Sequence, residues 1–189
     1  AYINYCKENY RDALQWFEKS RSDLRFAEIS DYYIVECRFM LKDYDYVVAN
    51  GEKIYESISD ERKPFMARMI SESNLVNGDV EKARKYYELT LNAPDSTKTR
   101  SDWFFSGSVL YAVDDYKGAI ENYTKMTERT DSLGQIANYH LGFSYIQTHN
   151  KVAALDAFKS AALSDFDKAI TEDAYFNWAK LAFDINTDT

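Results

Sequence analysis

The sequence predicts an all-α fold in which antiparallel helix-turn-helix pairs stack in series as an α-solenoid. One observation is a small residue followed four positions later by an aromatic one, in a pair that recurs along the chain. Clear copies are Ala13/Phe17, Ala83/Tyr87, Ala119/Tyr123 and Ala154/Phe158, and a degenerate copy is Val47/Gly51. Successive copies start 34, 36, 36 and 35 residues apart, a period typical of stacked helical repeats. The other observation is that 189 residues include only two prolines and six glycines, which favours uninterrupted helices.

The composition supports a continuous core and argues against a nucleic-acid surface. Apolar residues make up 46% of the chain, so disorder is not expected. The net charge is −8 at pH 7, whereas phosphate binding needs clustered Lys and Arg. We interpret the acidic surface as favouring solubility, with recognition of a basic partner as the alternative. No stretch of about 20 apolar residues occurs, so no membrane-spanning segment is predicted.

Five polar turns divide the chain into helix pairs. They lie at 7–10, 42–44, 77–79, 114–116 and 148–151, where Gly, Asn and Asp supply turn conformations and helix caps. We call the helix before each turn A-type and the helix after it B-type. The prediction is a partial repeat over 1–24, repeats over about 25–59, 60–95, 96–131 and 132–165, and an unpaired last helix over about 166–186. This makes about 11 helices.

Each repeat is justified by its own residues. The first contributes Ala13 and Phe17 to a B-type helix, and the second has Val47 and Gly51 in their place, with Tyr46 and Tyr55 able to supply the missing bulk. In the third, one face of the B-type helix is apolar and the other charged. The fourth and fifth repeats carry the fullest sets of small and bulky residues, which are Trp103, Gly107, Ala119 and Tyr123, and then Leu141, Gly142, Tyr145, Ala154, Phe158 and Ala161.

These residues resemble the consensus of the tetratricopeptide repeat family. The set in the fifth repeat falls on family positions 7, 8, 11, 20, 24 and 27, and the set in the fourth on positions 4, 8, 20 and 24. The third repeat departs from the pattern, because Ser71 stands at the small position and Asn74 where an aromatic is usual. The resemblance implies a right-handed superhelix of stacked units that acts as a protein-binding scaffold.

The small residues have a steric role in this pattern. Helices of A-type and B-type cross closely where the side chains are small, and a ring from one helix fills the gap beside the other. We therefore expect Gly142 and Ala154 to be contact points. Replacing either by Leu is expected to cost about 1–3 kcal/mol by overpacking.

Both ends resemble internal positions of a repeat array. Ala1 stands at the small position of an A-type helix whose first half is missing, and residues 173–183 form another A-type helix without a B-type partner. Natural arrays normally end in a polar-faced cap. The expectation is a piece of a longer array, with a C-terminal capping helix as the alternative.

The resemblance also implies where a partner binds. In the family, A-type helices line a concave wall whose positions 2, 5, 9 and 12 touch ligands. Transferred to this chain, the candidate partner-binding residues are Tyr32, Glu36, Phe39, Arg68, Glu72, Phe104, Ser108, Tyr111, Tyr139 and Phe143. The rings at position 5, Tyr32, Phe104 and Tyr139, are the leading candidates. The alternative for each residue is that it packs against a neighbouring helix.

The wall predicts the chemistry of the partner. Family members that grip a C-terminal carboxylate place Lys at position 5 and Asn at position 9 of their first unit, and no repeat here has that pair. An acidic peptide terminus is therefore disfavoured. We expect a protein or peptide partner that presents an apolar or aromatic segment.

No pattern in the chain indicates catalysis, a metal or a cofactor. The two histidines, His140 and His149, are nine residues apart, which fits no compact zinc spacing. No glycine-rich phosphate loop occurs. Cys6 and Cys37 lie on successive A-type helices, so a disulfide is conceivable, but buried free thiols are the simpler interpretation.

The expected function is a non-enzymatic interaction scaffold. Two alternatives remain open: a structural array that self-associates, and a regulatory arm of a larger protein whose catalytic domain lies outside this chain. A monomer is expected. The repeat spacing and the segment 175–181 also resemble long bacterial envelope proteins with many tetratricopeptide units, which implies a periplasmic or outer-membrane-associated compartment in preference to the cytoplasm.

Overall fold

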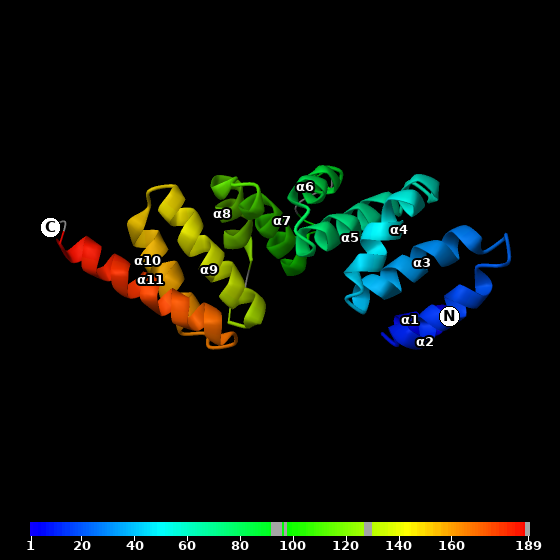
Figure 1. Ribbon diagram of the computed structural model, residues 1–189, viewed down its shortest axis with the longest axis horizontal. Coiled ribbons are helices and arrows are strands. Elements are labelled where there is room, and N and C mark those ends of the chain that lie inside the picture. Colours follow the sequence, from blue (N-terminus) through cyan, green and yellow to red (C-terminus); the bar gives the residue numbers. More distant parts are fainter. Residues whose placement is uncertain (92–95, 97, 127–129, 188–189) are drawn as a thin grey trace. The chain divides into compact units, whose positions relative to one another are not determined.

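The computed structural model describes residues 1–91, 96, 98–126 and 130–187, and in these residues the chain is helical without strands (Figure 1). Helices account for 77% of the described residues, which confirms the all-α prediction. The described part holds eleven helices: α1 (Tyr2–Cys6), α2 (Tyr10–Ser20), α3 (Ala27–Met40), α4 (Tyr44–Ser57), α5 (Lys63–Val76), α6 (Val80–Glu88), α7 (Arg100–Ala112), α8 (Tyr116–Lys125), α9 (Ser132–Gln147), α10 (Lys151–Ala162) and α11 (Lys168–Thr187).

The chain forms two compact units, Ala1–Ala93 and Pro94–Thr189. Within each unit every helix packs against the next one in sequence, from α1 to α6 in the first and from α7 to α11 in the second. Helices of A-type also contact one another, since α3 touches α5, and α9 touches both α7 and α11. One helix pair lies inside each predicted repeat, while the repeat boundary expected at residue 95 falls outside the described residues.

The five turns between A-type and B-type helices share one geometry. In each turn one residue has a positive φ, and the residue that follows it is the N-cap of the B-type helix. The side chain of this N-cap residue accepts a hydrogen bond from a backbone N–H in the first turn of the helix. The N–H of each capping residue also bonds the carbonyl five residues earlier, at 2.8–2.9 Å, which closes the preceding A-type helix. The five pairs are Glu8–Asn9, Lys42–Asp43, Gly78–Asp79, Asp114–Asp115 and His149–Asn150. The predicted capping role of Asn and Asp is confirmed.

Small residues allow the closest helix crossings, as expected. A Cβ built on Gly142 of α9 would lie 2.7 Å from the Phe158 ring of α10, and one on Gly107 of α7 would lie 2.7 Å from the Tyr123 ring of α8. In the third repeat Ser71 stands at the same position, and its hydroxyl donates a 2.5 Å hydrogen bond to the Ala83 carbonyl. The predicted contact at Gly142 is therefore confirmed.

The degenerate second repeat has a physical explanation. A Cβ on Gly51 of α4 would lie 2.7 Å from the Ile70 side chain of α5, so an aliphatic group from the next helix fills the space where other repeats place a ring. Ile70 is fully buried there. Tyr46 and Tyr55, expected to supply bulk, pack at the edge of the same core and stay partly exposed.

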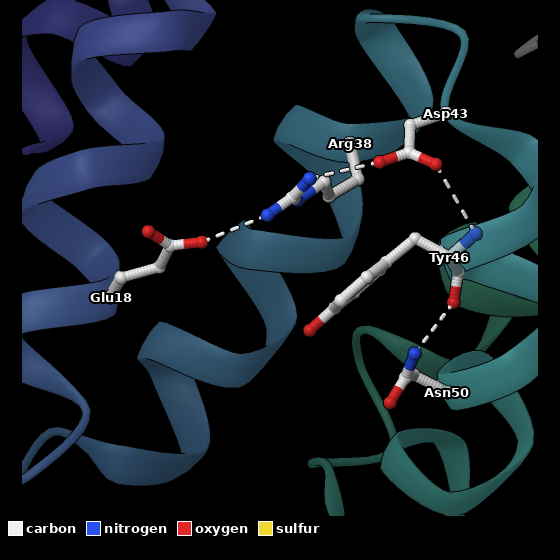
Figure 2. Close-up of polar contacts among 5 residues, drawn as sticks. All are labelled: Glu18, Arg38, Asp43, Tyr46 and Asn50. Atoms are coloured by element: carbon white, nitrogen blue, oxygen red, sulfur yellow. Dashed lines mark hydrogen bonds and ion pairs between the residues drawn. The ribbon is translucent and has the colours of Figure 1, made fainter.

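A cluster of polar contacts joins α2, α3 and α4 in the first unit (Figure 2). Arg38 of α3 donates to the Glu18 carboxylate of α2 at 3.0 Å and to the Asp43 carboxylate at 2.9 Å. Asp43 in turn caps α4 by accepting from the Tyr46 N–H. The guanidinium lies 4.8 Å from the centre of the Tyr46 ring. One side chain thus links α2, α3 and the start of α4.

Candidate functional site

Predicted wall residues of the first unit lie on α3 and α5. Tyr32 is only 6% exposed and belongs to the apolar core, so its ring packs between helices and offers a partner little surface. Phe39 is half-buried at the edge of the same core and contacts the Tyr44 ring. On α5, Arg68 and Glu72 are half-buried and form an ion pair at 3.9 Å.

Glu36 of α3 takes part in an internal network. Tyr5 and Tyr32 both hydrogen-bond to its carboxylate. Burial raises the pKa of Glu36, and the hydrogen bonds from the two tyrosines and the charge of Arg62 partly offset this rise. Its hydrogen-bonding capacity is therefore used within the protein, which makes Glu36 a weaker ligand contact than the family position implies.

The second unit brings together the aromatic part of the predicted wall. Phe104 and Tyr111 lie on α7, Tyr139 and Phe143 lie on α9, and all four rings are half-buried with some surface exposed. The Tyr139 and Phe143 rings meet edge to face at 5.0 Å. We call these four residues the aromatic strip. Because α7 and α9 contact each other, the strip spans two neighbouring A-type helices.

The aromatic strip is joined to α11 by one polar contact. The Tyr139 hydroxyl donates to the Asp173 carboxylate at 2.7 Å, and the Asn177 amide donates to the same oxygen at 2.8 Å. Burial raises the pKa of Tyr139, and the bond to Asp173 raises it further. The hydroxyl therefore stays protonated at neutral pH and holds the ring in place.

Ser108, the remaining predicted residue of α7, belongs to a buried polar chain. Its hydroxyl donates to the Phe104 carbonyl at 2.9 Å and lies 3.0 Å from the Tyr123 hydroxyl. Tyr123 in turn contacts His140 Nδ1 at 2.8 Å, and the His140 ring stacks on Tyr111 at 4.2 Å. Burial lowers the pKa of His140 to about 4, so the imidazole is neutral at pH 7. These contacts hold α7, α8 and α9 together, so the role of Ser108 is structural.

Sequence analysis missed two hollows in the second unit, beside the B-type helices α8 and α10. The larger measures about 600 Å³ and the smaller about 220 Å³. Both are lined by Asn138 of α9 and Ser160 of α10. The sequence does differ at this place, because Asn138 stands at repeat position 4, where the fourth repeat has the buried Trp103.

A third hollow, of about 360 Å³, lies beside α9, α10 and α11. Its lining mixes Ile146 and Leu181 with the polar groups of His149, Lys151, Lys180 and Asp184. It shares no residue with the aromatic strip.

Three further observations bear on other kinds of site. No group of three or more His, Cys, Asp or Glu side chains in the described residues is arranged to hold a metal ion. Cys6 is exposed, Cys37 is buried, and both are free thiols. Among the helices described, none has the length and apolar character needed to cross a bilayer.

Comparison with known proteins gives no relative from which a function can be taken. No family model, no curated protein and no solved structure matches the chain.

Proposed function

We propose that this chain is a non-enzymatic interaction scaffold of the tetratricopeptide-repeat type, which holds an apolar or aromatic segment of a partner protein on its A-type helices. The observation that carries the proposal is the aromatic strip of Phe104, Tyr111, Tyr139 and Phe143, whose rings are half-exposed on two adjoining helices. Aromatic side chains dominate the energetics of protein interfaces, because they bury much area with few rotatable bonds.

The packing inside each unit supports an α-solenoid arrangement of that unit. Helices contact their sequence neighbours, and A-type helices contact the next A-type helix. Repeats that share a core only with their neighbours leave one surface of the A-type helices for a partner.

The electrostatics of the strip disfavour an acidic partner segment. The nearby ionisable groups are already engaged, because Asp173 accepts from Tyr139 and Asn177, and His140 is buried and neutral. An acidic ligand would lose hydration there and would meet the Asp173 carboxylate instead of a counter-charge. An apolar segment would gain by burying the four rings.

The test is affinity capture with the intact protein and with the double variant Phe104→Ala/Tyr139→Ala. We expect the wild type to retain a partner that the double variant releases, because truncation of two interface rings commonly costs several kcal/mol. Direct titration of the captured partner would then measure the loss of affinity.

Trp16→Ala is the matched control, because Trp16 is an exposed ring on a B-type helix in the first unit. It should retain the partner at wild-type level. The circular dichroism of both variants should stay helical. Equal capture by the wild type and the double variant would refute a role for the strip.

A specific observation favours self-association as a second candidate function. Helix α11 exposes Phe176 at 66% and Phe183 at 69%, seven residues apart and therefore on one face. Exposed rings in a row on one helix are typical of an interaction surface. Light scattering over a wide concentration range would test it. A mass that rises with concentration and returns to that of one chain in Phe176→Glu/Phe183→Glu supports it, whereas a constant monomer mass rejects it.

A further inference from the structure

Helix α11 carries two large rings on its solvent-facing side. Phe176 and Phe183 are 66% and 69% exposed, and Ala179 between them is also exposed. Successive residues of a helix are about 100° apart, so these three lie within about 60° of one another. Ala174 and Leu181 lie on the opposite side, in the core that α11 shares with α10 (Figure 1). The exposed side is therefore the apolar face that this core leaves uncovered.

Two charged residues flank Phe176 on the same side of the helix. Glu172 precedes it by four residues and Lys180 follows it by four, so the three form one row along the helix surface. Both charged side chains are exposed. Among the described residues neither has an ion-pair partner within the chain. Lys168 and Asp184 continue the row by four more residues at each end.

The order of charges along this row is its own complement when reversed. Turning the row end over end about Phe176 brings Glu172 to the place of Lys180 and Lys168 to the place of Asp184, so every charge meets its opposite. Asp184 already has a contact within its own chain, so the inner pair matters most.

This reversal distinguishes between the two orientations of a second α11. An antiparallel copy places Glu172 beside Lys180 and also opposes the two helix macrodipoles. A parallel copy places Glu172 beside Glu172 and Lys180 beside Lys180, which is destabilising. The charge pattern therefore selects an antiparallel copy of the same helix.

Ordinary helix packing accommodates such a pair. In the commonest class of helix contact, rows of residues four apart on the two helices align with each other, and the helices cross obliquely. With Phe176 at the crossing point, the Phe176 rings of the two copies meet, and aromatic pairs are favourable beyond the area that they bury. Asp173, the other charge near the row, is already held by Tyr139 and Asn177.

We propose that α11 pairs with α11 of a second copy of this chain in antiparallel orientation, with the Phe176 rings in contact and Lys180 of each copy donating to the Glu172 carboxylate of the other. The pairing rests on self-association, the second candidate function, and adds its orientation and its contacts. One helix from each chain buries less surface than a standard interface, so the dimer dissociates on dilution.

Sedimentation equilibrium of the full chain, at concentrations from about 10 μM to 1 mM, tests the pairing. The mass of the wild type should rise from one chain toward two. Glu172→Lys and Lys180→Glu should each weaken the dimer at least about tenfold, because each substitution places like charges together at both ends of the contact.

Mixing the two variants tests the orientation. In an equimolar mixture, the lysine introduced at position 172 of one chain meets the glutamate introduced at position 180 of the other, while the native Lys180 and Glu172 form the second pair. Association should therefore return to about the level of the wild type. The double variant Glu172→Lys/Lys180→Glu should dimerise as well, because both of its pairs are reversed in sign together.

Glu121→Lys and Lys117→Glu are the matched controls. Both residues are exposed on α8, in the same unit, and the two substitutions change the net charge as the test variants do. Each should dimerise like the wild type. All substituted positions are exposed, so the circular dichroism of every variant should stay helical.

Each outcome decides for or against the pairing. A wild type that stays monomeric over the whole range would overturn both the pairing and self-association. If this monomer captures another protein that Phe176→Glu/Phe183→Glu releases, the face belongs to that protein. A dimer insensitive to the charge reversals, or one that mixing does not restore, overturns the antiparallel pairing alone. Loss of partner capture by the strip variants bears only on the scaffold function.

Discussion

At Gly142 the α9 backbone lies so close to Phe158 that even one added carbon would meet the ring at 2.7 Å. Replacing a helical glycine by alanine normally stabilises by about 0.5–1 kcal/mol. Here we predict the opposite sign: Gly142→Ala should destabilise, and Gly142→Leu should cost about 1–3 kcal/mol by overpacking. Urea unfolding of each variant measures the change.

The steric cause can be separated from a backbone effect by a double-mutant cycle. Combined with Phe158→Leu, which removes the ring, Gly142→Ala should cost less than it does alone. If the stability costs of the two substitutions simply add, the contact with Phe158 is not the cause of the destabilisation. An unchanged stability of Gly142→Leu would show that the repeat register is wrong.

A second residue-scale prediction concerns His140. Its ordinary pKa is 6.5, and burial lowers it to about 4 in the folded protein. Between these values the unfolded chain binds more protons than the folded one, so stability should fall as pH falls from 6.5 toward 4. The loss attributable to this one residue is up to about 3 kcal/mol. Unfolding midpoints measured across this range test the prediction.

His140→Phe provides the control, because it keeps an aromatic ring beside Tyr111 but cannot titrate. The variant should be less stable at pH 7, where it loses the Tyr123 hydrogen bond, and its stability should depend less on pH. Glu36 acts in the other direction, since its raised pKa makes stability fall as pH rises through the window above 4.5. Equal pH slopes in wild type and variant would refute the role of His140.

At the scale of the element, the shared turn geometry predicts that two substitutions change the stability in opposite directions. His149 and Gly78 occupy the same turn position with φ of 61° and 82°. Left-handed backbone costs a non-glycine residue energy that glycine does not pay. We expect His149→Gly to stabilise by about 0.5–1 kcal/mol and Gly78→Ala to destabilise by a similar amount. Thermal unfolding of the two variants gives the comparison. The same sign for both would contradict the shared geometry.

At the scale of the whole molecule, each unit has its own buried clusters. Tyr32, Val47 and Ile70 belong to a core of the first unit, and Tyr123 and Leu141 to a core of the second. We predict that residues 1–91 and residues 98–187, each produced separately, form helical proteins that unfold cooperatively, since serially packed repeats depend mainly on their neighbours. Circular dichroism melts measure this. A fragment with the spectrum of an unfolded chain would contradict the prediction for that unit.

The parts of the fold that are local in sequence were predictable. The five turns, their Asn and Asp caps and the helix pairs around them follow from short motifs at a fixed spacing, and the structure has each cap in place. The close contact at Gly142 was predictable for the same reason, because Gly142 and Phe158 belong to one repeat. Family membership and partner binding remain predictions.

The parts that depend on a neighbouring repeat were not predictable. Gly51 breaks the small-and-aromatic pattern because Ile70 comes from the next helix to fill the space. Tyr32 stands at a position expected to face a partner but lies in the core. The rings of Phe104 and Tyr139 keep exposed surface at the same repeat position.

By itself the sequence determined the helical class, the period and the turns, since these arise from backbone preferences and contacts within about 35 residues. Only the tertiary structure decided which rings are buried, which polar groups are paired and where hollows lie on the second unit. The reason is that burial and pairing depend on the volumes of side chains from several helices at once. The burial of Tyr32 at a repeat position where Phe104 and Tyr139 keep exposed surface is an example that no periodic pattern records.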